Sequence, residues 1–132
     1  MAIVAITILA AVSCRKQTGI PKISDPVPVT ARQVNFSLYT TKDFSNDNGT
    51  IQFTATIRNA TQVLWDSILP PMKIKDIPSV INKINISKAV PGNDHSQLSV
   101  GFIYYIQNVG QSWYLQTFDA GQAVKAVDYN FQ

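Results

Sequence analysis

Apolar and polar residues alternate along the chain from residue 33 onward. Between residues 33 and 38, and again between 50 and 58, every second residue is apolar, beginning with Val34 and Ile51. An alternation of period two predicts β-strands that bury one face. Turn-forming residues separate further segments of this kind, which predict strands over residues 62–66, 72–75, 81–87, 97–107, 112–118 and 123–131. The segment Pro78-Ser79 predicts one short helical turn, and Asn48-Gly49 predicts a hairpin turn.

About eight short strands separated by frequent turns predict an all-β fold, an antiparallel sandwich over residues 33–132. The pattern is similar to immunoglobulin-like sandwiches, without the Cys…Trp…Cys signature of antibody domains. This resemblance implies an architecture and says little about activity. The expected core residues are large and apolar: Phe36, Ile51, Phe53, Trp65, Phe102, Tyr104, Trp113 and Leu115.

The N-terminus has a different pattern, an uncharged apolar run over residues 2–12. This is the length of a signal-peptide core. The four residues Ala11-Val12-Ser13-Cys14 resemble the lipobox of bacterial lipoproteins, with Ala11 in place of the usual Leu and no Lys or Arg before the apolar run. The resemblance implies a signal peptide over residues 1–13, lipidation of Cys14 and membrane anchoring in the cell envelope, at the outer membrane of a Gram-negative bacterium. The alternative is a buried N-terminal strand with a core cysteine.

Residues 14–32 are expected to be a basic, proline-containing tether, and residues 27–30 are alternatively an edge strand. The net charge of +3 lies in this tether. It carries four basic residues and one aspartate, whereas residues 33–132 carry seven of each. A positive charge confined to the tether argues against a nucleic-acid partner and suits anionic lipid headgroups beside an anchor.

Candidate catalytic groups are few. The chain has no glutamate, one histidine (His95) and one cysteine. We expect no catalytic triad, no cofactor and no metal site, because His95 lies in a turn-like segment with no nucleophile motif around any serine. The Asp/Asn-rich segment before Gly49 does not match a calcium loop, because Phe44 takes the first ligand position. A pair of aspartates acting as acid and base is the residual enzymatic alternative.

A hairpin tip at Val109-Gly110 would place Tyr105 beside Tyr114 on the outer face of the sandwich, and Ile103 beside Gln116. Two adjacent tyrosines would form an amphipathic platform that binds a sugar or a protein. Packing that only stabilises the hairpin is the alternative. Separately, the triplet Asp66-Ser67-Ile68 resembles a bacterial O-glycosylation signal at Ser67.

These observations predict a non-enzymatic envelope lipoprotein whose β-sandwich binds a protein or polymer partner. The alternative function is a carbohydrate-binding module that uses the tyrosine platform. An aspartate-dependent hydrolase is the least favoured possibility, because the sequence identifies no acid–base pair.

Overall fold

The computed structural model describes residues 31–132. The predicted signal peptide, the lipidated Cys14, most of the predicted tether and the alternative strand at residues 27–30 lie outside the described residues. Among residues 31–132, no helix has the length and hydropathy needed to cross a membrane.

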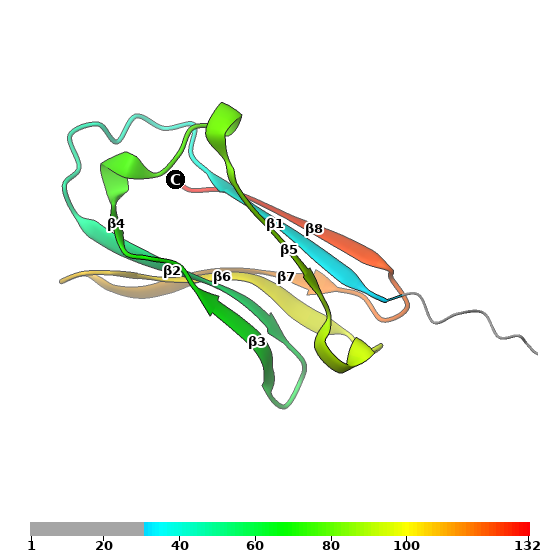
Figure 1. The fold of residues 1–132 in the computed structure, drawn as a ribbon. Coiled ribbons are helices and arrows are strands. Elements are labelled where there is room, and N and C mark those ends of the chain that lie inside the picture. Colours follow the sequence, from blue (N-terminus) through cyan, green and yellow to red (C-terminus); the bar gives the residue numbers. More distant parts are fainter. Residues whose placement is uncertain (1–30) are drawn as a thin grey trace, which may run out of the picture. The chain divides into compact units, whose positions relative to one another are not determined.

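The described residues form two β-sheets that pack face to face (Figure 1). The strands are β1 (Gln33–Tyr39), β2 (Thr50–Arg58), β3 (Val63–Ile68), β4 (Met72–Lys73), β5 (Ile84–Ala89), β6 (Leu98–Ile106), β7 (Gly110–Phe118) and β8 (Val124–Asn130). Three single-turn 3₁₀ helices connect them: η2 (Ile74–Asp76), η3 (Val80–Asn82) and η4 (Pro91–Asn93). The prediction of an all-β sandwich of about eight strands is confirmed, and η3 follows directly on the predicted helical turn at Pro78-Ser79.

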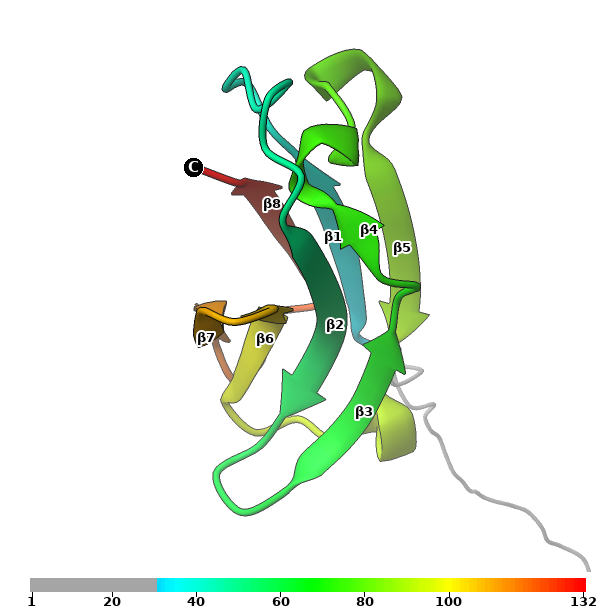
Figure 2. The same cartoon turned by 90° about the vertical axis from the view of Figure 1, so that its left-hand side faces the viewer.

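One sheet has the strand order β5-β1-β8, and the other has the order β3-β2-β6-β7 with β4 beside β2. Figure 2 shows β3 and β2 side by side in the second layer. The pairing of β1 with β8 is parallel, while all the other pairings are antiparallel. In antibody constant domains the first two strands share a sheet, whereas here β1 and β2 lie in different sheets. The likeness to immunoglobulin sandwiches is therefore one of layers and not of strand order.

The segment from residue 40 to residue 49 differs from its prediction. It crosses from one sheet to the other, so the hairpin expected between the first two strands is wrong. The Phe44 side chain packs against Phe131 with 5.5 Å between the ring centroids. This contact draws the segment over one end of the sandwich.

The core lies between the two sheets and is rich in aromatic rings. Phe36, Phe53 and Phe102 are buried, and the Phe36 and Phe102 rings meet edge to face with 5.6 Å between their centroids. Ile51 is also buried, while Trp65 and Tyr104 are partly buried and pack against this core. Six of the eight expected core residues therefore lie in the core or against it. Trp113 and Leu115 do not, because the strand that carries them pairs in a different register.

The β6–β7 hairpin turns at three residues, Gln107 to Val109, and not at the predicted pair Val109-Gly110. Asn108 has a φ of +66°, a backbone conformation that asparagine tolerates in tight turns. The Val109 N–H donates to the Ile106 carbonyl over 3.0 Å and closes the turn. The observed pairing of Ile103 with Trp113 replaces the predicted pairing of Ile103 with Gln116, a shift of three residues. Because strand side chains alternate between faces, an odd shift reverses every side chain of β7.

Arg32 belongs to the sandwich and not to the predicted tether. Its side chain is 2% exposed, and its guanidinium lies 4.0 Å from the centre of the Phe118 ring. The guanidinium donates to four backbone carbonyls at distances of 2.7–2.8 Å, those of Asp94, Ser96, Asp119 and Gln122. Burial lowers the pKa of Arg32, and the nearby Asp94 opposes that shift. With Arg32 included, the described residues carry eight Lys and Arg residues against seven aspartates.

Candidate functional site

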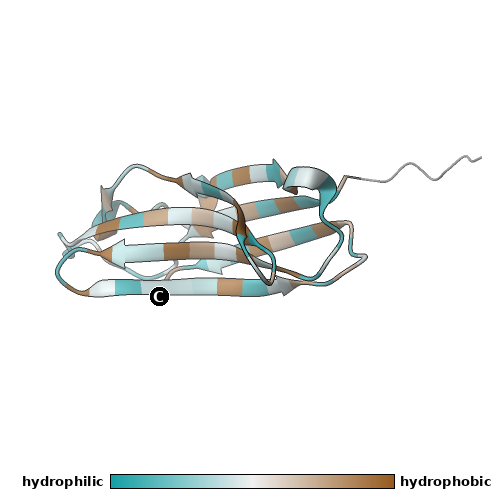
Figure 3. Cartoon of the chain, turned by 90° about the horizontal axis from the view of Figure 1, so that it is seen from below, coloured by the Kyte–Doolittle hydropathy of each residue, from teal (hydrophilic) through white to brown (hydrophobic). Residues whose placement is uncertain are grey.

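The two outer faces of the sandwich differ in chemistry. On the three-stranded sheet, short polar side chains bond to one another: Ser37 Oγ donates to Asn85 Oδ1 and Ser87 Oγ donates to Asn35 Oδ1, each over 2.9 Å. The five-stranded sheet presents large apolar side chains among polar ones, and apolar and polar bands alternate along its strands in Figure 3. The candidate site therefore lies on the outer face of the five-stranded sheet.

Five of the apolar side chains on this face are together called the outer patch: Ile68, Ile103, Tyr105, Trp113 and Leu115. The register brings them together. Ile103 on β6 lies between Trp113 on β7 and Thr54 on β2, and Thr54 in turn lies opposite Ile68 on β3. The exposed fraction is 65% for Trp113, 52% for Tyr105 and 68% for Ile68. Several large apolar residues gathered on one face mark a binding surface more strongly than scattered ones.

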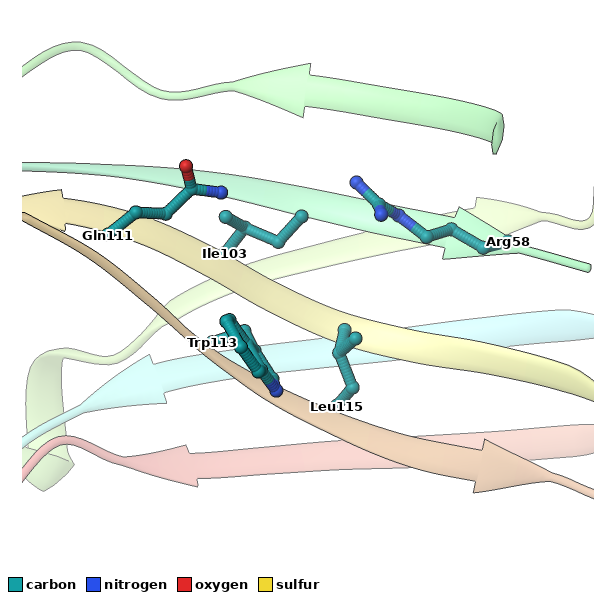
Figure 4. A pocket seen from close by; sticks show the side chains of 5 residues that line it. All are labelled: Arg58, Ile103, Gln111, Trp113 and Leu115. Atoms are coloured by element: carbon teal, nitrogen blue, oxygen red, sulfur yellow. The ribbon is translucent and has the colours of Figure 1, made fainter. Parts of the chain in front are cut away.

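A pocket of about 300 Å³ opens within the outer patch. It is lined by Arg58 from β2, Ile103 from β6, and Gln111, Trp113 and Leu115 from β7 (Figure 4). In Figure 4 the three-stranded sheet lies behind the strands that carry these side chains. The volume is at the lower end of the range of about 300–1,000 Å³ that is typical of small-molecule sites. A pocket with three apolar walls, one cation and one amide can bind a small group that has an apolar face and polar substituents.

Gly101 allows the backbones of β6 and β7 to lie close together next to the pocket. It lies between Thr56 and Leu115 in the sheet, on the same face as Ile103. A Cβ atom at this position would overlap the backbone oxygen of Tyr114 and lie 3.0 Å from the Leu115 Cα. No side chain therefore fits at residue 101 unless the backbone of β7 moves.

Arg58 is the single charged residue that lines the pocket. Its Nε donates to the hydroxyl of the buried Thr56 over 3.0 Å, which fixes the direction of the side chain. Within residues 31–132 its two terminal nitrogens donate to no protein group, and Arg58 takes part in no ion pair. The face of the guanidinium fork is therefore free to bind a ligand.

Two of the four predicted binding residues lie where they were expected. Tyr105 and Ile103 face outward, whereas Tyr114 and Gln116 face inward, so the predicted Tyr105–Tyr114 platform is wrong. The Tyr114 ring stacks on Tyr129 with 4.3 Å between centroids, and Gln116 Nε2 donates to the Tyr114 hydroxyl over 2.6 Å. Burial, followed by the hydrogen bond with Tyr104, raises the pKa of Tyr129.

The expectation from sequence missed Trp113, Arg58, Gln111 and Leu115 as site residues. The signal that identifies the β7 residues is Asn108, since a turn with a positive φ at asparagine sets the observed register. Arg58 sits at the end of an alternating strand, where a charged residue is usual. Nothing in the sequence distinguishes it from a solvated end residue.

The remaining predicted sites are separate from the pocket. Ser67 lies opposite the buried Ala55 on the inward side of β3 and is half-buried, which leaves its hydroxyl less accessible than a glycosylation site on a surface loop. His95 is exposed in the segment after η4. In the part of the chain that the structure describes, no three histidine, cysteine or acidic side chains gather into a site for a metal ion.

Aromatic, amide and guanidinium groups surround the pocket in the outer patch, and no acid–base pair lines it. No protein-family model, no curated protein and no solved structure matches this chain.

Proposed function

We propose that this protein is a non-enzymatic envelope lipoprotein that binds a protein or polymer partner through the outer patch. The observation that carries the proposal is Trp113, which is 65% exposed and lines a pocket of about 300 Å³. Tryptophan is one of the residues enriched at the positions that contribute most of the binding energy of an interface. The anchor at Cys14 rests on the lipobox-like residues Ala11 to Cys14.

A carbohydrate-binding module is the second candidate function, and the composition of the pocket favours it. Trp113 offers a flat ring for stacking, and Gln111 offers both a donor and an acceptor for hydroxyl groups. An aromatic ring with polar groups beside it was also what the predicted tyrosine platform would have offered to a sugar. Trp113 takes the place of Tyr114, with Tyr105 alongside on β6.

Retention of the purified Cys14→Ser chain, which lacks the proposed lipid anchor, on isolated cell-envelope material tests the outer patch as the binding surface. Trp113→Ala should weaken retention at least tenfold, because it removes the largest exposed ring of the outer patch. The matched control is Ile81→Ala, which removes a side chain that is 86% exposed on η3, away from the pocket. Equal retention of the Cys14→Ser chain with and without the Trp113→Ala substitution, with both folded, would refute the outer patch as the binding surface.

A further inference from the structure

The pocket in the outer patch contains one positive charge that no acidic side chain of residues 31–132 pairs with. Arg58 is its single ionised residue, and its Nε is already bonded to Thr56. The ion pair formed within residues 31–132 joins Lys83 to Asp128 on the other sheet, 3.9 Å apart. A guanidinium with two free terminal nitrogens presents a fork that matches the two oxygens of a carboxylate.

The walls of the pocket narrow the kind of molecule that can carry this carboxylate. Trp113, Ile103 and Leu115 supply apolar surface, and Gln111 supplies an amide. A ligand that combines a flat apolar face, hydroxyl groups and a negative charge would match all of these walls. A pyranose ring with a carboxylate has all three features.

The backbone of the central strand takes no part in binding a ligand on the outer face of the sheet. β6 is paired along its length with β2 on one side and with β7 on the other. The backbone of β6 beneath the pocket is used in these ladders and is not available to a peptide main chain. Above β6, recognition therefore comes from side chains, which suits a sugar with substituents around its ring, whereas the outer edge of β7 pairs with no other strand of residues 31–132.

We propose that the pocket binds a uronic-acid unit of an acidic polysaccharide. The pyranose ring stacks on Trp113, its carboxylate pairs with Arg58, and Gln111 bonds to a ring hydroxyl. This inference rests on the proposed binding function and names the class of its partner. It goes beyond a neutral sugar platform because it requires the charge of Arg58.

Asp66 is a second charged residue near the pocket and allows a further test of ligand charge. It lies on the same outer face, directly opposite Thr56, and forms no ion pair with Arg58. The negative charge of Asp66 weakly repels an acidic ligand in the pocket. Removing that charge should therefore strengthen the binding of an acidic ligand and leave the binding of a neutral one unchanged.

The test compares two ligands that differ at a single carbon of each sugar unit, a galacturonic-acid oligomer and the same oligomer with its carboxylates reduced to alcohols. Binding to the purified full-length chain is measured by calorimetry. The acidic oligomer should bind at least tenfold more tightly than the reduced one.

Four variants show which side chains cause this preference. Arg58→Gln should remove the preference, and Trp113→Ala should weaken the binding of both oligomers. Asp66→Asn should tighten the binding of the acidic oligomer about two- to threefold. Lys125→Gln, which removes a positive charge on β8, is the matched control and should change neither.

Three outcomes overturn the inference, and the first two separate it from the proposed function. If both oligomers bind equally through Trp113, the site takes neutral sugars and Arg58 has no role in specificity. If neither binds while retention on envelope material still depends on Trp113, the partner is not a uronic-acid polymer and the binding function stands. If neither binds and retention does not depend on Trp113, both fail together.

Discussion

The rings of Tyr114 and Tyr129 lie stacked, with 4.3 Å between their centroids and 11° between their planes. This contact joins β7 of one sheet to β8 of the other. It places Tyr114 on the inner side of its strand, which turns Trp113 and Leu115 outward. The stack and the outer patch are therefore two consequences of a single register.

The observed register predicts that two tyrosines on the same hairpin contribute very differently to the free energy of unfolding. Tyr114→Ala should lower the free energy of unfolding by about 2–4 kcal/mol, because it removes a ring that packs against the core. Tyr105→Ala removes an exposed ring and should change the free energy of unfolding by less than about 0.5 kcal/mol. Urea denaturation of the two variants gives both values. Similar losses for the two would support the alternative register, with both rings outside.

The buried Arg32 predicts a large loss of stability on substitution. Arg32→Met keeps the apolar stem but leaves four backbone carbonyls without their donor, so we expect a loss of about 3–5 kcal/mol. Arg32→Lys should recover only part of it, since an ammonium group lacks the planar fork. Thermal denaturation provides the comparison. A melting temperature for Arg32→Met that equals the wild-type value would mean that Arg32 belongs to the tether after all.

Asp94 predicts a dependence of stability on acid. Hydrogen bonds from Ser96, with a further one from Asn59, lower its pKa to about 2. The ordinary pKa of an aspartate is about 3.9. The depressed value means that the folded state holds the ionised form more favourably. The stabilisation is therefore complete above about pH 4 and is lost as the pH falls toward 2.

We expect the wild type to lose more stability between pH 5 and pH 2 than Asp94→Asn, which has no carboxylate to protonate. Denaturant midpoints at several pH values measure this difference. Asp43, whose pKa is lowered by its bonds with Ser45, is present in both proteins and cancels in the comparison. Parallel pH profiles for the two proteins would show that Asp94 does not contribute.

The anchor predicts a specific chemical modification. A metabolic fatty-acid probe should label the wild-type chain at Cys14 and should not label Cys14→Ser. The variant should also leave the membrane fraction, because it has lost its acyl chains. Equal labelling of the two chains would exclude the lipoprotein interpretation without affecting the sandwich.

Alternation of period two located most strands to within a few residues, because burial of one sheet face demands it. The pairing of strands was harder to predict, since it depends on turns. Asn108 and Gly110 both have a positive φ in this hairpin, +66° and +133°, and the sequence does not say which of them lies at the tip. Arg32 was assigned to the tether because a charged residue beside a proline-rich segment is usually solvated. Its partners are backbone carbonyls from residues 94–96 and 119–122, which no local pattern reveals.

The two tryptophans allow the most direct test of the outer patch. Trp113 is exposed in the pocket, whereas Trp65 is partly buried against the core. Hydroxyl-radical footprinting with mass spectrometry can compare the oxidation of both rings in the free chain and in the chain bound to envelope material. Binding through the outer patch predicts that Trp113 becomes protected while Ile81 and Trp65 keep their oxidation rates. Oxidation of Trp113 at the same rate in the bound and free chains would contradict the account.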